Sequence, residues 1–241
     1  MNSVNHTKTA LVTGANKGIG FAIAQGLGSL GFTVAVGARD DARREAAVER
    51  LRAEGIDAFG VALDVTSDDS VAAAATSIEK EAGRLDVLVN NAGISGRFED
   101  GAQDPTTLDL GLLHTVLDTN VFGVIRVTNA MLPLLSRAAA PRIVNMSSTM
   151  GSLALQSGPM AAAYAPSKSM LNSVTAQYAR RFADTNIIVN AACPGYVATD
   201  FTGFAGDRTP EQGAAIALHL ATLPDDGPRG GFFDDKGAVA W

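Results

Sequence analysis

The sequence contains a single cysteine, Cys193, and a single tryptophan, Trp241, among its 241 residues. One cysteine excludes an internal disulfide framework and a metal site built from several cysteines, and it is typical of a reducing compartment. The first seven residues have no apolar core, and no later run approaches the roughly 18 apolar residues of a membrane span. The sequence therefore predicts a cytoplasmic protein with no metal and no membrane partner.

An excess of positive charge is also missing. Lys and Arg total 19 against 25 Asp and Glu, which leaves a net charge of -6. Nucleic acid is therefore not an expected partner, because its phosphates demand a cationic surface. Hydrophobic residues make up 46% of the chain and charged residues 18%, unlike a disordered protein. The length suits one α/β domain, so we expect a single domain over residues 1–241.

Short apolar or β-branched runs alternate with longer segments of helical periodicity. The expected strands are 9–13, 32–36, 58–62, 86–89, 142–146, 187–191 and an edge strand near 231–233, and the expected helices are 18–30, 41–54, 67–83, 106–136, 161–183 and 209–222. Such alternation implies right-handed crossovers and a parallel sheet covered on both faces. The sequence predicts a doubly wound α/β domain with a mainly parallel, seven-stranded sheet.

A glycine-rich loop follows the first expected strand and opens the first expected helix. It reads Gly14-Ala15-Asn16-Lys17-Gly18-Ile19-Gly20. Gly14 permits a sharp turn, Gly18 lets backbone amides approach a pyrophosphate, and Gly20 lets the helix lie close to the sheet. This position makes a dinucleotide site the favoured interpretation over an ordinary turn, with a Rossmann-type cofactor half at about 8–95 and a catalytic half at about 96–241.

The choice of dinucleotide depends on the end of the second expected strand. Asp40 lies about twenty residues after the glycine loop, where an acid would hold the ribose 2′-hydroxyl of NAD. Arg39 beside it would instead pair with the 2′-phosphate of NADP, and Lys17 adds a second cation. Asp40 also fits the N-cap of the helix that begins there. We favour NADP(H), with NAD as the alternative.

Five further motifs appear in a fixed order. They are Leu63-Asp64-Val65, Asn90-Asn91-Ala92-Gly93, Asn145-Met146-Ser147-Ser148, Tyr164-Ala165-Pro166-Ser167-Lys168 and Cys193-Pro194-Gly195-Tyr196-Val197-Ala198-Thr199. With the glycine loop they resemble the short-chain dehydrogenase/reductase family over nearly the whole chain. Asn16-Lys17, Ala38-Arg39-Asp40 and the tail to Trp241 look most similar to its NADPH-dependent carbonyl reductases.

The spacing of Tyr164 and Lys168 places both side chains on one face of a helix. A cation ~4 Å from a phenol, in an effective dielectric of ~20, favours the phenolate by roughly 4 kcal/mol. That would bring the pKa of Tyr164 toward neutrality, where proton transfer works best. The sequence thus predicts Tyr164 as the acid that protonates a carbonyl oxygen, and the resemblance implies that Lys168 also holds the nicotinamide ribose.

The resemblance supplies the rest of the catalytic set. It implies that Ser148 donates a second hydrogen bond to the carbonyl oxygen, with Ser147 as the rival, and that Asn120 positions a water in the proton relay. It also assigns cofactor contacts. Asp64 and Val65 would meet the adenine, Asn91, Ala92 and Gly93 would line the cleft, and Ile19, Pro194, Gly195, Val197 and Thr199 would lie near the nicotinamide half.

Substrate contacts are expected from two segments. Ser148 and Tyr164 are 16 positions apart, which is much shorter than in the monomeric carbonyl reductases. Apolar residues in this segment and after the sixth strand would line a pocket for a fairly hydrophobic ketone, aldehyde or quinone: Met150, Leu155, Tyr196, Phe201 and Phe204, beside Ser148 and Tyr164. The resemblance further implies a homodimer or homotetramer built on the long helix and the Tyr164 helix.

Three other functions compete with carbonyl reduction. A non-catalytic dinucleotide sensor typically lacks the tyrosine or lysine, and both are present here. A cofactor-free dehalogenase on this scaffold would not need Gly14, Gly18 and Gly20. An NAD-linked alcohol dehydrogenase differs from the favoured reading mainly at Arg39 and Asp40.

Overall fold

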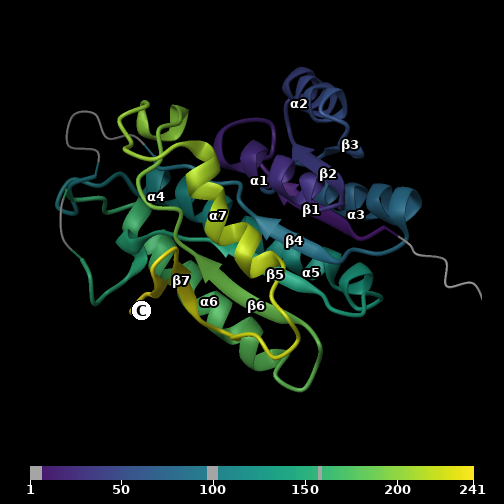
Figure 1. Cartoon of the computed structure of the whole chain (residues 1–241). Coiled ribbons are helices and arrows are strands. Elements are labelled where there is room, and N and C mark those ends of the chain that lie inside the picture. Colours follow the sequence, from purple (N-terminus) through teal and green to yellow (C-terminus); the bar gives the residue numbers. More distant parts are fainter. Residues whose placement is uncertain (1–6, 97–102, 157–158) are drawn as a thin grey trace, which may run out of the picture.

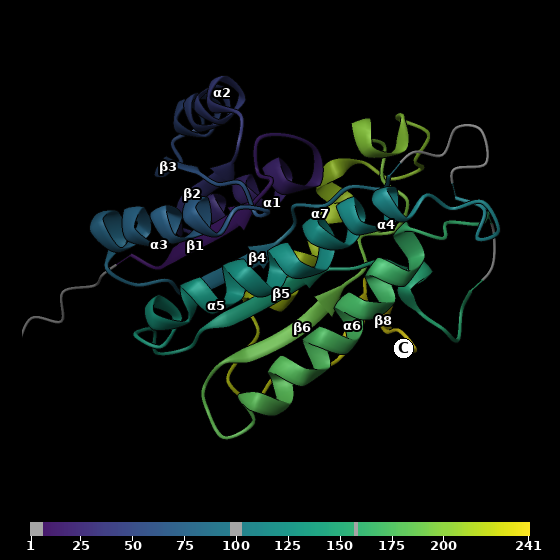
Figure 2. The same ribbon diagram turned by 180° about the vertical axis from the view of Figure 1, so that it is seen from behind.

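The computed structural model describes residues 7–96, 103–156 and 159–241. Its strands form one sheet in the order β3-β2-β1-β4-β5-β6-β7-β8 (Figures 1 and 2). Their bounds are β1 Thr9–Thr13, β2 Thr33–Ala38, β3 Ala58–Ala62, β4 Val87–Asn90, β5 Arg142–Met146, β6 Ile188–Ala192, β7 Phe232–Asp234 and β8 Gly237–Ala238. All neighbours pair in parallel except β7 and β8. The strand order reverses between β1 and β4, and ligands of such sheets bind at the carboxyl ends beside that point.

Helices cover both faces of the sheet. The helices are α1 Gly18–Ser29, α2 Asp41–Ala53, α3 Asp68–Ala82, α4 Leu110–Leu117, α5 Gly123–Leu135, α6 Tyr164–Arg181 and α7 Pro210–Ala221. One core cluster joins the sheet to α1, α2 and α7, the side seen in Figure 1. A second cluster joins it to α3, α5 and the end of α6, the side seen in Figure 2. The predicted doubly wound α/β class is therefore confirmed.

The sheet differs from the prediction by one strand. Seven strands were expected and eight are present, because the tail turns back after β7 and adds the two-residue antiparallel strand β8. Both residues of β8 are exposed, so they carry no alternating apolar pattern that a sequence could show. Strand β8 is the last strand at one edge of the sheet. It is far from the point between β1 and β4 where the strand order reverses.

The helix expected at 106–136 is broken into three parts. It begins at Leu110, passes through a π-helical turn, η2, at Asp118–Phe122, and continues as α5. The helix expected at 161–183 begins at Tyr164 and ends at Arg181. A π turn inserts one extra residue into the helical ladder and often marks a functional position. Here it contains Asn120.

By length and composition, Leu110–Leu135 is also long and apolar enough to cross a membrane, with a mean hydropathy of 1.2. In this fold the segment is instead a layer on the sheet. Met131, Leu134 and Leu135 are buried in the core, and Arg126 forms ion pairs with Asp118 and Asp68.

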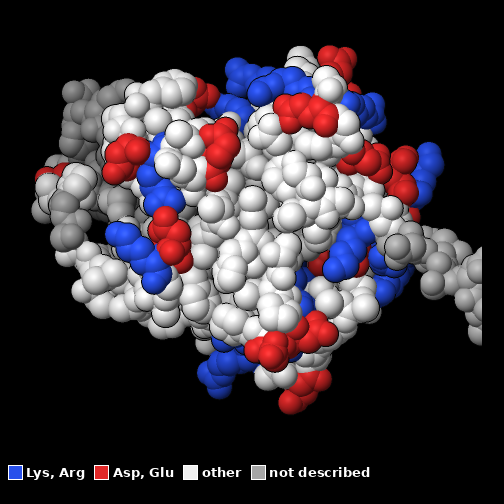
Figure 3. Space-filling view, viewed as in Figure 1, with Lys and Arg blue, Asp and Glu red and all other residues white. Residues whose placement is uncertain are grey.

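On the opposite side of the molecule, charged groups of both signs surround a largely uncharged centre (Figure 3).

Candidate active site

The glycine loop leaves β1 at the carboxyl edge of the sheet. Gly14 and Gly18 have positive φ values of 65° and 55°, which other residues rarely adopt. A Cβ on Gly20 would lie 2.3 Å from the Gly14 carbonyl oxygen, so the helix is as close to the loop as glycine allows. Helix α1 begins without a side-chain cap and without an acid in its first turn. Its amides and positive dipole end thus fit the pyrophosphate of a dinucleotide.

The loop is fastened to the end of β4 by Asn91 and Thr13. The Asn91 amide donates to the carbonyls of Thr13 (2.9 Å) and Gly14 (3.3 Å), and the backbone amides of Asn91 and Ala92 both donate to Thr13 Oγ1 at 2.9 Å. Asn91 and Ala92 thus support the predicted cleft. Sequence reasoning did not single out Thr13, although a polar residue ending a buried strand was the available signal.

The next two strand ends bring Arg39 and Asp64 together. Arg39 is exposed after β2, and its charge helps to hold the pKa of the Asp64 carboxyl below its ordinary value. The larger cause is Thr66, whose hydroxyl and backbone amide donate to Asp64 Oδ1 at 2.7 and 3.0 Å. Asp40 accepts from Arg43 N at 2.9 Å and caps α2, as the N-cap interpretation predicted. One oxygen of its carboxylate is therefore bonded to the start of the helix.

Val65 and Lys17, which were predicted to contact the cofactor, also contact other residues of the protein. Val65 is buried and packs under Gly123, where a Cβ would lie 2.9 Å from Val65 Cγ2. Lys17 pairs with Asp200 at 2.5 Å, an exposed ion pair that joins the glycine loop to the segment after β6. Asn16 belongs to the same turn, between β1 and α1.

The segment after β6 lies against the glycine loop. A Cβ on Gly18 would be 3.3 Å from Thr199 Cγ2, and a Cβ on Gly213 would meet Val197 at 2.6 Å and Ile19 at 3.6 Å. The structure thus brings Ile19, Val197 and Thr199 together, as expected for the nicotinamide half. Pro194 and Gly195 lie in the irregular segment just after β6, and Gly195 has a φ of 78°.

Tyr164, Ser148 and Lys168 form the centre of the site. Tyr164 opens α6 and is buried, as is Lys168 one helical turn later, while Ser148 is half-buried after β5. Lys168 Nζ lies 5.6 Å from the centroid of the Tyr164 ring and donates to the Met146 carbonyl at 2.8 Å. The Phe201 ring meets the Tyr164 ring edge-on at 5.6 Å.

Burial decides the titration of this pair. It raises the pKa of the Tyr164 phenol above its ordinary value of 10.0, although a hydrogen bond with Ser148 opposes the rise. It also lowers the pKa of Lys168 to about 8. The expectation that Lys168 lowers the pKa of Tyr164 toward neutrality is wrong for the chain by itself, because burial of the phenol raises that pKa and the hydrogen bond with Ser148 offsets the rise only in part. Near neutral pH the phenol keeps its proton, and Lys168 is charged.

Asn120 braces the segment after β4 against α6. It exchanges two 2.8 Å hydrogen bonds with the backbone of Ile94, and its amide donates to Ser167 Oγ at 3.0 Å. Ser167 in turn donates to the Tyr164 carbonyl at 2.6 Å. Gly93 lies beside this brace, since a Cβ there would be 3.2 Å from Asn120 Oδ1 and 3.7 Å from Lys168 Nζ. The π turn thus delivers an amide to the helix that carries Tyr164.

The two serines after β5 face different partners. Ser147 is buried and donates to Asn172 Oδ1 at 2.6 Å, whereas Ser148 bonds to Tyr164. Of the other predicted substrate residues, Phe201 reaches Tyr164, and Met150 is half-buried in the 3-10 turn after Ser148. Leu155, Tyr196 and Phe204 are exposed apolar side chains, and Phe204 has a positive φ of 60°.

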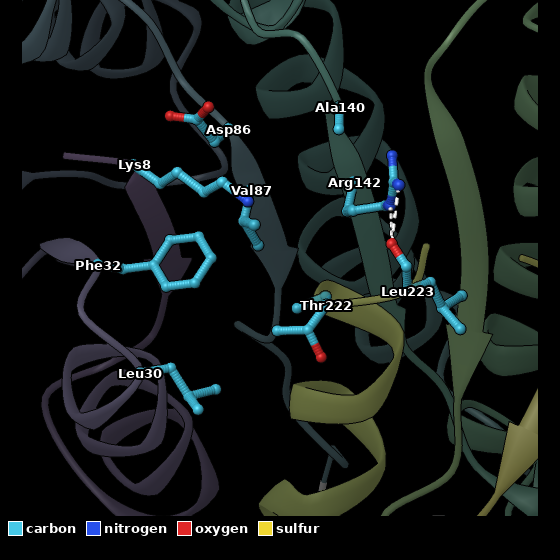
Figure 4. Close-up of a pocket in the computed structure, with 10 residues that line it drawn as sticks. Lys8, Leu30, Phe32, Asp86, Val87, Ala140, Arg142, Thr222 and Leu223 are labelled. Carbon is cyan, nitrogen blue, oxygen red and sulfur yellow. Dashed lines mark hydrogen bonds between the residues drawn. The ribbon is translucent and has the colours of Figure 1, made fainter. Parts of the chain in front are cut away.

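A separate cavity of about 260 Å³ lies at the opposite, amino-terminal end of the sheet (Figure 4). Arg142, Lys8 and Phe32 are among its lining residues. The Arg142 guanidinium is already bonded to the Leu223 carbonyl, at 2.9 and 2.7 Å, and to Asp225. These bonds hold the fold together, so the Arg142 guanidinium has a structural role. The cavity is separate from the residues gathered at the carboxyl end of the sheet. In the described part of the chain, no group of three His, Cys, Asp or Glu residues forms a metal site.

The family model for short chain dehydrogenases matches residues 8–209. The chain belongs to the short-chain dehydrogenase/reductase family. Short-chain dehydrogenase/reductase 1 of Saponaria officinalis is 36% identical, with 93% of each chain covered. Carbonyl reductase (NADPH) 1 of Sus scrofa is 35% identical, covering 98% of this chain and 95% of that one. The predicted family is therefore confirmed.

A solved member of the family shares the whole architecture. The NADPH-bound carbonyl reductase from chicken fatty liver superposes with a TM-score of 0.86 at 30% identity, covering 98% of this chain and all of that one. The alignment with the Sus scrofa relative runs over 282 positions, more than the 241 residues of this chain. The Sus scrofa carbonyl reductase therefore carries inserted residues that the present chain lacks.

Proposed function

We propose that the protein transfers a hydride from NADPH to the carbonyl of a fairly hydrophobic ketone, aldehyde or quinone. The observation that carries the proposal is the meeting of the Ser148 hydroxyl and the protonated Tyr164 phenol beside Lys168, at the carboxyl end of the sheet. The names of the relatives, carbonyl reductase (NADPH) among them, support the same reaction.

The residues around the glycine loop would hold the dinucleotide. NADPH, when bound, supplies the hydride. Arg39 and Lys17 would take its 2′-phosphate, and the uncapped start of α1 would take its pyrophosphate. The remaining contacts are proposed from Gly14, Asn16, Gly18, Ile19, Gly20, Asp64, Val65, Asn91, Ala92, Gly93, Tyr164, Lys168, Pro194, Gly195, Val197 and Thr199.

Each side chain of the central group has a distinct role in the proposal. Tyr164 gives its phenolic proton to the carbonyl oxygen as negative charge develops there, and the product is an alcohol. Ser148 donates a second hydrogen bond to the same oxygen. The Lys168 ammonium holds the ribose and favours the phenolate that remains after proton transfer. Asn120 acts through α6 as a positioning residue, because its amide is bonded to Ile94 and Ser167.

The raised pKa of Tyr164 favours reduction over the NAD-linked oxidation of an alcohol. A reduction needs the phenol protonated at the start, and burial maintains that state at neutral pH. An oxidation needs a phenolate, which burial disfavours. Burial of the phenol thus supports Tyr164 as the proton donor of the proposed reduction.

Exposed apolar side chains in the segments that follow Ser148 and β6 support a hydrophobic substrate. Phe201 contacts Tyr164, and Leu155, Tyr196 and Phe204 are 49%, 54% and 67% exposed. We propose that these residues, with Met150, Ser148 and Tyr164, contact the substrate. Large apolar groups cost free energy when left in water, so a substrate that covers them gains affinity.

The assembly proposed is a homodimer or homotetramer of one-domain cytoplasmic subunits, with the cofactor half at about 8–95 and the catalytic half at about 96–241. Exposed apolar residues on α4 and α6 support it, since Leu110 is 68% exposed and Met170 41%. Light scattering is expected to give a mass above that of one 24.8 kDa chain, and a purely monomeric sample would contradict the proposal.

The test of the function is an assay of NADPH oxidation at 340 nm with a panel of carbonyl compounds. The panel pairs an aromatic ketone and a quinone with small polar ketones of similar reactivity. Turnover of the apolar members with NADPH is expected. Failure of the purified, folded protein to bind NADPH in a fluorescence titration would remove both the cofactor assignment and the reaction.

Binding of NADPH is expected to weaken above pH 8. Burial lowers the pKa of Lys168 to about 8, so the ammonium is present below that pH and is lost above it. If the charged form is the one that holds the ribose, the dissociation constant stays flat below about pH 8 and rises as the pH increases beyond it. Titrations between pH 6.5 and 9.5 test this. Lys168→Met should bind more weakly at low pH and lose the dependence, and a flat profile for the unmodified protein would contradict it.

A further inference from the structure

Gln103 is a buried side-chain amide that joins two segments flanking the site. Its Oε1 accepts from the Ala163 backbone amide at 3.0 Å, and its Nε2 donates to the Ser95 carbonyl at 3.2 Å. Its own backbone carbonyl accepts from Ala162 N at 3.1 Å. Only 4% of its surface is exposed. One residue therefore connects the segment after β4 to the two residues that precede Tyr164.

Helix α6 has no cap from its own sequence. Its N-cap position is Ala163, which has no side-chain oxygen to accept a helix amide. The first amides of a helix lack partners within the helix, and leaving such a donor buried and unpaired costs stability. Gln103 satisfies one of these donors from sixty positions earlier in the chain. The helix that presents Tyr164 thus begins where Gln103 binds it.

Asn120 supplies a second cross-link of the same kind. It connects Ile94 to Ser167, and Ser167 donates to the Tyr164 carbonyl. The two amides therefore start from neighbouring residues of one segment, Ile94 and Ser95, and end on either side of Tyr164. Two such points of attachment fix both the position and the rotation of the first turn of α6.

The backbone makes room for the Gln103 amide at Gly96. This glycine has a φ of 79°, and a Cβ there would lie 2.9 Å from Gln103 Nε2. A larger residue at position 96 would be strained and would push against the amide. The Gln103 amide is therefore packed closely against the backbone at Gly96.

We propose that Gln103 is a positioning residue for proton transfer, which caps α6 and holds the Tyr164 phenol beside Ser148. The inference rests on the proposed function, because it assigns Gln103 to the reaction in which Tyr164 is the acid. The phenol must lie within hydrogen-bond reach of the carbonyl oxygen, and a displacement of about 1 Å can cost on the order of 100-fold in rate.

The main test replaces Gln103 with Met, which has a similar length and no comparable donor or acceptor. Gln103→Met is expected to lower kcat by about 10- to 100-fold while the dissociation constant of NADPH changes less than about twofold. The solvent deuterium isotope effect on kcat should rise, because transfer of the Tyr164 proton becomes rate-limiting. Gln103→Glu keeps an acceptor for Ala163 N and is expected to retain most of the kcat.

The matched control is Asn190, another buried amide with the same kinds of bonds. It accepts from Gly231 N at 3.0 Å and donates to the Pro228 carbonyl at 2.7 Å, next to β7 rather than beside α6. Asn190→Leu should lower the melting temperature without changing kcat or the isotope effect in the fraction that remains folded. If Gln103→Met does not fold, Gln103→Asn, which withdraws the amide by one methylene, carries the same test.

Two results would overturn the inference. One is an unchanged kcat in Gln103→Met, and the other is a loss of kcat accompanied by an unchanged isotope effect and an equal loss of NADPH affinity. A Tyr164→Phe sample in the same assay separates this failure from failure of the proposed function. If Tyr164→Phe is inactive while Gln103→Met is normal, only the role of Gln103 is wrong. If Tyr164→Phe is active, the proposed reaction is wrong.

Discussion

Tyr164→Phe is expected to lower kcat for carbonyl reduction by about 10²- to 10⁴-fold, with NADPH affinity changed less than about twofold. The substitution removes one oxygen and its proton, and the ring that packs against Phe201 remains. Positive charge on Lys168 would persist near neutral pH, so the dinucleotide site keeps its ribose partner. The loss therefore falls on the proton-transfer step, and steady-state kinetics beside a fluorescence titration will separate it from binding.

The control for this substitution lies on the same helix. Tyr178 is also on α6, where its hydroxyl donates to Asn129 Oδ1 at 2.8 Å, away from Ser148 and Lys168. Tyr178→Phe removes the same atom and should leave kcat unchanged within about twofold, because the group touches neither substrate nor cofactor. If Tyr164→Phe retained the rate of Tyr178→Phe, another group would have to supply the proton.

Much of the fold follows from the sequence because its strands are buried on both sides. The central strands read as short apolar runs, and β1, β3 and β5 have the predicted bounds. Parallel pairing then places the carboxyl ends of β1 to β7 at one edge, so motifs scattered from Gly14 to Thr199 gather without any knowledge of side-chain contacts. The two-residue strand β8 was missed because it buries nothing.

The polar contacts that fix the site could not be predicted in the same way. Asn91 binds Thr13 across 78 positions, Lys17 meets Asp200 across 183, and Gln103 reaches Ala163 across 60. Such pairs leave no periodicity, since each depends on where two distant segments are packed. The π turn at Asn120 is similar, because its apolar neighbours continue a helical pattern that gives no sign of the extra residue.

The titration of Tyr164 shows where sequence reasoning fails in physical terms. The spacing of Tyr164 and Lys168 gives the distance between two groups but not the water around them. Both groups are buried, and desolvation raises the pKa of the phenol while it lowers that of the amine. A sequence therefore identifies the pair correctly and still assigns the pKa shift of Tyr164 the wrong sign.

Arg39→Ser is expected to weaken NADPH binding by about 10- to 100-fold and to leave NADH binding unchanged within about twofold. A charge-assisted hydrogen bond contributes about 1.5–3 kcal/mol, which corresponds to that range of dissociation constants. Arg39 is suited to the 2′-phosphate because it is exposed after β2 and, among the described residues, forms no ion pair within 4 Å. NADH lacks that phosphate and serves as the internal control.

Lys17 should contribute less than Arg39 to the affinity for NADPH, because Lys17 already has an ion-pair partner. Its ammonium is paired with Asp200 at 2.5 Å, so binding a phosphate requires the lysine to leave or share a carboxylate. Lys17→Met is therefore expected to weaken NADPH binding by less than Arg39→Ser when both are titrated at one salt concentration. Arg180→Ser, which removes a distant surface charge, controls for net charge.

Equal weakening of NADPH binding and NADH binding by Arg39→Ser would contradict the assignment of Arg39. It would mean that this arginine binds a part common to both dinucleotides, and that the preference for NADPH arises elsewhere.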